Sequence, residues 1–181
     1  ITVNGDTRFD AVLRLTINWK PNELIVNWLQ ESSCVVVAGS TWPSDEEEIV
    51  HFVKTQPQVK WIIAPHNLDK EMLKETLHLF EHPHCYSQLG QKNLTIPTLQ
   101  NVLVIDNVGM LRYLYKYATV CYIGGGFTGS GIHNVLEAAV YGKPVVHGPE
   151  FSKFAEAKGL LEAGGSFVVT SALSLESTLN E

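Results

Sequence analysis

Short apolar runs alternate along this chain with amphipathic segments that carry a helical repeat. The apolar runs are rich in β-branched residues, as buried strands are, and span residues 34–38, 61–64, 85–88, 102–105, 120–123, 144–147 and 166–169. The amphipathic segments span residues 21–31, 45–54, 69–80, 109–117, 133–141 and 151–163. This alternation predicts an α/β fold, a Rossmann-like three-layer sandwich in which helices cover both faces of a mainly parallel sheet.

The residues between these segments support the predicted boundaries. Ser44 and Glu47 have the spacing of a capping box, and Pro43 prevents the helix from extending backwards. Gly142 ends a helical segment just before a strand, and the polar stretch 90–100 predicts a loop. In such sheets, ligands bind beyond the carboxyl ends of the strands, so the strand-to-helix turns are the places to look for a site.

The chain has 181 residues, which suits one domain with a buried core. Residues 1–3 read as a strand with no initiator Met, and residues 173–181 read as a helix cut short. We therefore interpret residues 1–181 as a single domain excised from a longer protein.

Composition and charge narrow the possible partners. Hydrophobic residues make up 45% of the chain and charged residues 18%, an ordinary globular balance. The net charge of −6, without any run of Lys and Arg, argues against a nucleic-acid partner, so local hydrogen-bond donors would have to hold an anionic ligand. Cys34, Cys85 and Cys121 are far apart and are expected to be buried, reduced thiols. No apolar stretch approaches the roughly 20 residues that cross a bilayer.

The segment 122–137, YIGGGFTGSGIHNVLE, is the best candidate for chemistry. A strand runs into Gly124, Gly125 and Gly126, two more glycines follow, and a helix is expected to begin near His133. Glycines let the backbone approach a ligand closely, and the first N–H groups of a helix carry a partial positive charge. The sequence therefore predicts a phosphate-binding turn here.

Asn134 and Glu137 are three residues apart and share one face of this predicted helix. A carboxylate at that place can accept hydrogen bonds from the two hydroxyls of a ribose. Simpler explanations stay open for each residue taken singly, because the helix dipole alone favours an early Glu and glycines often only form turns.

Taken together, these motifs resemble a known family. The segment 124–150, GGGFTGSGIHNVLEAAVYGKPVVHGPE, resembles the donor-site signature of the 3-deoxy-D-manno-octulosonic acid (Kdo) transferases of lipopolysaccharide assembly, which are two-domain GT-B glycosyltransferases. Segments 3–10, 38–47, 62–66 and 106–115 resemble further motifs of the same family. The resemblance thus covers most of the chain.

The resemblance implies that this is the C-terminal, donor-binding domain and that the N-terminal acceptor domain is absent. The donor would be CMP-Kdo, and the sugar would pass to a lipid A precursor at the cytoplasmic face of the bacterial inner membrane. No bound metal or other cofactor is expected. The general base and any membrane contact would belong to the missing domain, so this domain alone is expected to bind the donor and to be inactive.

The family pattern also implies which residues meet the donor. They are Ser40, Thr41, Pro65, His66, Val108, Gly109, Gly124, Gly125, Gly126, His133, Asn134 and Glu137. The glycines with His133 and Asn134 would hold the phosphate. Glu137 would accept from the ribose hydroxyls, and the turns at 65–66 and 108–109 would flank the cytosine.

The chain departs from the family pattern at three positions in two of its turns. Trp42 replaces a usual His, Ser44 replaces a usual Gly, and His66 stands where many members carry Arg. A neutral imidazole cannot reproduce the fork of a guanidinium group, so we expect altered donor contacts beside His66.

Other polar clusters are weaker candidates. Solvated side chains are expected for His78, His82 and His84. The acidic run 45–48 is expected to interact with the dipole of its helix. No metal is assigned to either group. His147 and Glu150 follow a later strand and are further candidates for contact with the sugar.

Two other functions fit part of the pattern. A sugar-nucleotide epimerase that uses UDP-N-acetylglucosamine would explain the glycines and Glu137, but not the combined HNVLE and GKPVVHGPE motifs. A non-catalytic interaction module could have kept the fold without binding any nucleotide. The response of the protein to CMP and to UDP separates these alternatives.

Overall fold

The structure is a computed structural model that describes residues 7–30, 32–81, 83–91 and 101–181. Within these residues, seven parallel strands form one sheet in the order β3-β4-β2-β1-β5-β6-β7. The strands are β1 (Val35–Thr41), β2 (Lys60–Pro65), β3 (His84–Cys85), β4 (Val102–Val104), β5 (Val120–Ile123), β6 (Val145–His147) and β7 (Ser166–Val168). The predicted parallel sheet is confirmed.

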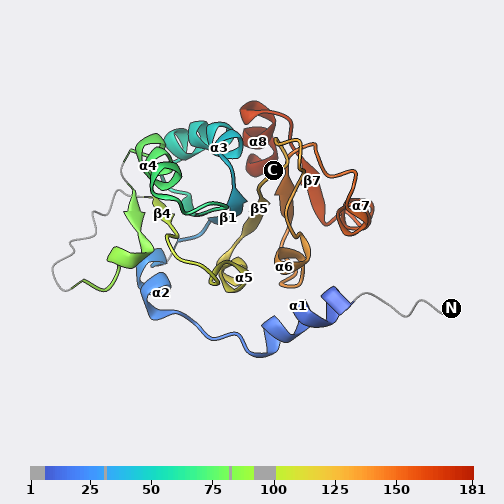
Figure 1. Ribbon diagram of the computed structural model, residues 1–181, viewed down its shortest axis with the longest axis horizontal. Helices are drawn as coiled ribbons and strands as arrows, with labels where there is room; N and C mark the ends of the chain where they lie inside the picture. Colours follow the sequence, from blue (N-terminus) through green and yellow to red (C-terminus); the bar gives the residue numbers. More distant parts are fainter. Residues whose placement is uncertain (1–6, 31, 82, 92–100) are drawn as a thin grey trace.

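Helices cover both faces of this sheet (Figure 1). They are α1 (Thr7–Ile17), α2 (Glu23–Leu29), α3 (Pro43–Thr55), α4 (Lys70–Leu79), α5 (Leu111–Leu114), α6 (Leu136–Ala139), α7 (Ala155–Glu162) and α8 (Ala172–Asn180), with two 3-10 turns, η1 (Tyr86–Gln88) and η2 (Tyr115–Tyr117). The helices α3, α4 and α8 lie on one face, and α1, α2, α5 and α6 lie on the other. The fold is therefore the predicted three-layer sandwich.

The alternation of side chains along each strand builds two separate apolar cores. In β1, Val35 and Val37 point into the core shared with α2 and α6, and Val36 and Ala38 point into the core shared with α3 and α8. Successive residues of a strand face opposite sides of the sheet, so a run of consecutive apolar residues can fill both cores. This explains why these strands read as continuous apolar segments.

The sheet reverses its order at β1. The chain adds β2, β4 and β3 on one side of β1, and later adds β5, β6 and β7 on the other side. The loops that leave β1 and β5 therefore meet at the carboxyl edge, where Gly124 N donates to Gly39 O at 2.9 Å. This switch in strand order is where open α/β sheets bind ligands.

Several predicted elements differ from the structure. The predicted strand 85–88 is only His84–Cys85, because the chain turns into η1 and the side chain of Gln88 accepts from Cys85 N at 2.9 Å. The helix expected over 133–141 is only the single turn of α6. The helix α1 was not predicted. The strand proposed at 1–3 lies outside the described residues, as do most of the loop at 90–100 and His82.

The predicted capping box was also wrong. Helix α3 begins at Pro43, with Trp42 as its N-cap residue, and the carboxylate of Asp45 accepts from Trp42 N at 2.9 Å. The reciprocal contact thus uses Asp45 in place of Glu47, because the helix begins two residues earlier than the sequence pattern suggests. Gly142 does end the α6 region, with a φ of 66° that an L side chain rarely adopts.

Candidate functional site

An open cleft of about 550 Å³ lies at the carboxyl edge of the sheet beside the switch point. It is lined by Arg8, Trp42, His66, Ser130, Gly131, Ile132, His133, Asn134, Phe154 and Glu156. Trp42 follows β1, His66 follows β2, and residues 130–134 belong to the loop after β5. The structure therefore brings together three of the predicted donor-binding turns, and we call this feature the switch-point cleft.

The three consecutive glycines pack against other parts of the backbone. A side-chain carbon added to Gly124 would lie 2.3 Å from Ser40 O, and one added to Gly126 would lie 2.6 Å from the backbone of Gly148. Gly125 has a φ of 91°, and its added carbon would lie 2.5 Å from Gly131 O. These contacts already require glycine, so its presence here is explained by chain packing before any ligand is considered.

The amide of Gly125 is already engaged by a carboxylate of the protein. Asp45 is fully buried and accepts from Gly125 N at 2.8 Å, from Trp42 N at 2.9 Å and from Tyr122 Oη at 2.9 Å. Burial raises the pKa of Asp45, and the three hydrogen bonds oppose that rise. Asp45 thus joins the start of α3 to the glycine loop. This role could not be predicted from the sequence, because an acidic residue early in a helix is ordinarily solvated.

Glu46 makes a second buried connection beside the first. Its carboxylate accepts from Thr41 Oγ1 and from Thr76 Oγ1, both at 2.8 Å. Burial raises its pKa, and the charge of Asp45 raises it further. The hydroxyl of Thr41, predicted to meet the donor, is therefore committed to an internal carboxylate.

The part of the glycine loop that faces outward is its second half. Gly129 and Ser130 are exposed, and a carbon added to Gly129 would meet nothing within 4 Å. Lys153 Nζ lies 3.5 Å from Gly129 O, which places a cation at this end of the loop. Within the described chain, the N–H of Asn134 has no acceptor, while its side chain accepts from Leu136 N at 3.0 Å and begins α6. Of these residues, Ser130 and Asn134 line the switch-point cleft, and the cation that lines it is Arg8, which is paired with Glu156 Oε1 at 2.7 Å.

Three aromatic rings line the other side of the cleft. The ring of His66 stacks on Trp42, with centroids 4.6 Å apart, and on His133, with centroids 4.3 Å apart. Trp42 Nε1 donates to His133 Nε2 at 3.3 Å. Two of the three positions at which the chain departs from the family pattern, Trp42 and His66, thus contact the predicted phosphate ligand His133 directly.

Glu137 lies apart from this cleft. It is half-buried at the start of α6, where burial raises its pKa and the charge of Arg112 lowers it. Burial raises the pKa of Tyr115 in η2 and of Tyr141 after α6, and the charge of Glu137 raises both further, so Glu137 lies near these two rings. Glu137 and Asn134 flank the same turn of chain but do not line one common hollow.

The remaining predicted residues occupy three other places on the carboxyl edge. Ser40 lies at a bulge one residue before the end of β1 and has a φ of 55°, an uncommon backbone conformation for a residue with a side chain. Pro65 ends β2 directly before His66. Val108, which is 90% exposed, and Gly109 lie in the turn after β4 and do not line the switch-point cleft.

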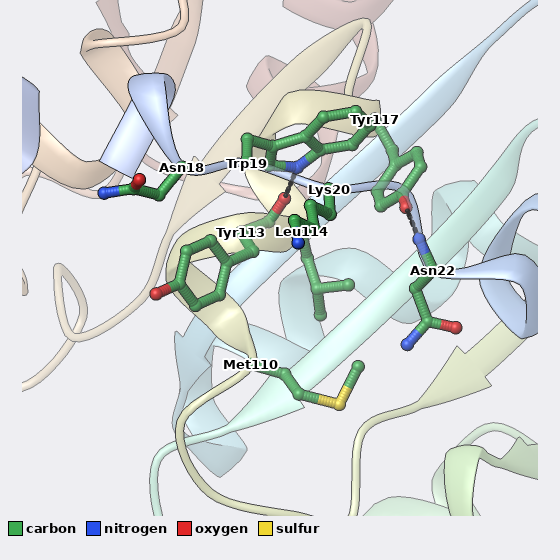
Figure 2. A pocket seen from close by; sticks show the side chains of 8 residues that line it. All are labelled: Asn18, Trp19, Lys20, Asn22, Met110, Tyr113, Leu114 and Tyr117. Carbon is green, nitrogen blue, oxygen red and sulfur yellow. Dashed lines mark hydrogen bonds between the residues drawn. The ribbon is translucent and has the colours of Figure 1, made fainter. Parts of the chain in front are cut away.

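A second hollow, of about 240 Å³, lies between the segment 18–22 and the helix α5 (Figure 2). Two of its polar groups bond to protein atoms: Trp19 Nε1 donates to Tyr113 O at 2.9 Å, and Asn22 N donates to Tyr117 Oη at 2.6 Å. We call it the aromatic pocket. Since these polar groups are already paired, it offers less to a polar ligand than the switch-point cleft does.

Neither a metal site nor a membrane span is found in the described part of the chain. No three side chains of His, Cys, Asp or Glu within it are placed to hold a metal ion. No helix within it has both the length and the apolar character that a membrane crossing needs.

Comparison with known proteins identifies the relatives of this chain. No family model matches it. The chain is 30% identical over 181 residues to the 3-deoxy-D-manno-octulosonic acid transferase of Rickettsia prowazekii, an alignment that covers 97% of this chain and 38% of the relative. The chain is a homologue of Kdo transferases. It spans well under half the length of this relative.

The fold of this chain is similar to the folds of several solved structures. The crystal structure of the C-terminal CMP-Kdo binding domain of WaaA from Acinetobacter baumannii has a TM-score of 0.71 and 21% identity, and the match covers 93% of this chain and 87% of that chain. UDP-GlcNAc 2-epimerase from Neisseria meningitidis has a TM-score of 0.63 and 17% identity, covering 98% of this chain and 45% of that chain. At these identities the likeness establishes the fold and nothing further.

Proposed function

We propose that this chain is the donor-binding part of a Kdo transferase and that it binds CMP-Kdo at the switch-point cleft. The support is the sequence relation to Kdo transferases along almost the whole chain, combined with the position of the cleft where the strand order reverses. The homologue is a 3-deoxy-D-manno-octulosonic acid transferase, and the cleft has room for an anionic donor.

The phosphate is best accommodated by the outward half of the loop after β5. The N–H of Asn134, the ring of His133 and the cation of Lys153 lie along that stretch. Because the overall charge of the chain is −6, fixed donors at short range must outweigh the repulsion of an anion by the whole molecule. Gly124, Gly125 and Gly126 support this loop from beneath, and His66 borders the cleft.

Glu137 would hold the ribose on the neighbouring face of α6. Its half-buried carboxylate, close to Arg112, is placed to accept hydrogen bonds from paired hydroxyls. The turns that hold Ser40, Pro65, Val108 and Gly109 would then border the sugar or the base.

Transfer itself needs groups beyond the donor. An acceptor oxygen must be activated by a base, and the departing phosphate must be stabilised. We propose that the described chain contributes the stabilisation, and that the base, the lipid A precursor and any contact with the inner membrane belong to the remainder of a longer protein. The reaction is proposed to need no metal. Incubating this chain alone with CMP-Kdo and a lipid A precursor should give no transfer.

Calorimetric titration with CMP and with UDP tests the donor assignment. Saturable binding of CMP that is clearly tighter than that of UDP supports a Kdo transferase donor site. Tighter binding of UDP would favour an epimerase-like site, and no response to either nucleotide would favour a non-catalytic module.

A single substitution locates the ribose contact. Glu137→Gln should weaken CMP binding about tenfold, because a hydrogen bond to a charged acceptor contributes about 1.5 kcal/mol. Glu162→Gln, an exposed change on α7, is the matched control and should leave the affinity unchanged. Equal affinities for wild type and Glu137→Gln would remove Glu137 from the site.

A further inference from the structure

The hydrogen bond between Trp42 and His133 fixes where the proton of His133 lies. Trp42 Nε1 carries a hydrogen and can only donate, so His133 Nε2, at 3.3 Å, must accept. A ring nitrogen that accepts carries no proton, and a neutral imidazole then has its proton on Nδ1. Burial lowers the pKa of His133, and the charge of His66 lowers it further, which agrees with a neutral ring.

The protein holds both partners of this bond in place. The backbone N–H of Trp42 donates to Asp45, and the same carboxylate oxygen accepts from Gly125 N. The backbone N–H of His133 donates to Gly124 O at 3.0 Å. The indole and the imidazole are therefore anchored to the same glycine loop, and the stacked ring of His66 restrains both.

We propose that Trp42 is a positioning residue that holds His133 as its Nδ1–H tautomer, so that this ring meets an anion in the switch-point cleft as a hydrogen-bond donor and not as a positive charge. Within the described residues, no acceptor bonds to His133 Nδ1, and His133 lines the cleft. The other titratable or charged groups that line it are Arg8, His66 and Glu156. The identity of the anion rests on the proposed function, whereas the tautomer is a property of the protein alone.

This arrangement departs from the pattern of the family that the sequence resembles. Trp42 stands where a His is usual, and His66 stands where many members carry Arg, so an uncharged indole and an imidazole replace an imidazole and a permanent charge. An imidazolium or guanidinium attracts an anion through its charge. A neutral Nδ1–H forms a directional hydrogen bond with the anion, but the bond is weaker because the ring carries no charge.

Nitrogen NMR of ¹⁵N-histidine-labelled protein without ligand tests the positioning role. The His133 resonances are assigned by their loss in His133→Gln. In wild type at neutral pH, Nδ1 should have the shift of a protonated ring nitrogen and Nε2 that of an unprotonated one. Trp42→Phe keeps an aromatic ring but removes the donor, and should give a mixture of tautomers and a raised His133 pKa.

Trp19→Phe is the matched control, because it removes an indole donor outside the cleft and should leave the His133 signals unchanged. A protonated Nε2 in wild type, or an unchanged His133 spectrum in Trp42→Phe, would overturn the proposal. The unshifted resonances of the histidines outside this stack, such as the buried His147, establish that each variant is folded, whereas His66 is expected to shift because it stacks on Trp42 and His133.

Titration of the same proteins with CMP tests the ligand half of the inference. At pH 8, Trp42→Phe should bind CMP about fivefold more weakly than wild type, and its affinity should rise more steeply as the pH falls, because His133 then gains a charge more readily. Identical affinities and pH profiles would contradict the donor role of His133. A wild-type protein that binds no CMP would contradict the proposed function instead, while the NMR result still decides the tautomer.

Discussion

The two hollows of this molecule differ in what their polar groups do. In the aromatic pocket, of about 240 Å³, the indole of Trp19 and the hydroxyl of Tyr117 bond to atoms of the chain itself. In the switch-point cleft, of about 550 Å³, the N–H of Asn134 and His133 Nδ1 have no acceptor among the described residues. The cleft therefore retains donors for a ligand, whereas the polar groups of the pocket attach the segment 18–22 to the domain.

The buried residues that hold the cleft in shape differ from the residues that line it. We call the first group the supports and the second group the contacts. Gly124, Asp45 and Glu46 are buried and bond to other parts of the protein, whereas His66, His133 and Asn134 line the cleft and are proposed to meet the ligand. Substitution of a support should thus reduce stability, whereas substitution of a contact should reduce binding.

The largest loss of stability should come from Gly124→Ala. The new methyl group would lie 2.3 Å from Ser40 O, so two loops at the switch point must separate. We expect the free energy of unfolding in urea to fall by about 3 kcal/mol. Gly129→Ala, where no atom lies within 4 Å, is the control and should change it little. Equal stability of the two variants would show that the loops do not pack as described.

Asp45→Asn should have the next largest effect. The amide that replaces one carboxylate oxygen cannot accept from all of the N–H and O–H groups that surround Asp45, so a buried donor is left without a partner. The expected loss is about 2 kcal/mol, measured by urea unfolding. The matched control is Glu47→Gln at the exposed neighbouring position, which should reduce the free energy of unfolding far less. If Asp45→Asn left the free energy of unfolding unchanged, the carboxylate would not join the two loops.

A substitution in the aromatic pocket should reduce stability by less than the two substitutions above, and it should leave CMP binding unchanged. Trp19→Phe removes the hydrogen bond to Tyr113 O, and we expect a loss of about 1 kcal/mol with no change in CMP affinity. Tyr113→Phe keeps that backbone acceptor and serves as the control. A marked loss of CMP affinity in Trp19→Phe would move the binding site to the aromatic pocket.

The smallest effect concerns pH. His147 is fully buried with Nε2 unpartnered, and burial lowers its pKa from 6.5, although its bond to Gly148 O opposes this. The folded state then binds fewer protons than the unfolded chain, so stability falls as the pH drops from about 6.5 through the lowered pKa. When urea unfolding is measured at a series of pH values, the free energy of unfolding of His147→Gln should fall less steeply with decreasing pH than that of wild type. The exposed change His51→Gln should leave the slope as it is, and equal slopes for wild type and His147→Gln would contradict the burial of a neutral ring.

Much of the fold could be predicted from the sequence, because continuous apolar strands and amphipathic helices follow directly from burial on two faces of a sheet. Helix α1 could have been predicted, because Phe9, Val12, Leu13 and Ile17 have the apolar spacing of a helix. What the spacing does not reveal is burial: Phe9, Leu13 and Ile17 are 49%, 55% and 80% exposed, and of the helix only Val12 is buried.

The site could be located from sequence but not explained by it. The glycine turn and His133 do lie at the switch point, as predicted. Which backbone each glycine packs against, and the burial of Asp45 beneath the loop, depend on segments far away in the sequence. The contact of Trp42 with His133 joins residues 91 positions apart and has no local signal.

The most direct test of this account is a crystal structure of the chain with CMP. We predict that the phosphate lies in the switch-point cleft, within hydrogen-bond distance of Asn134 N and His133 Nδ1, and that the ribose hydroxyls meet Glu137. CMP bound in the aromatic pocket, or a phosphate remote from the loop 128–134, would contradict the account.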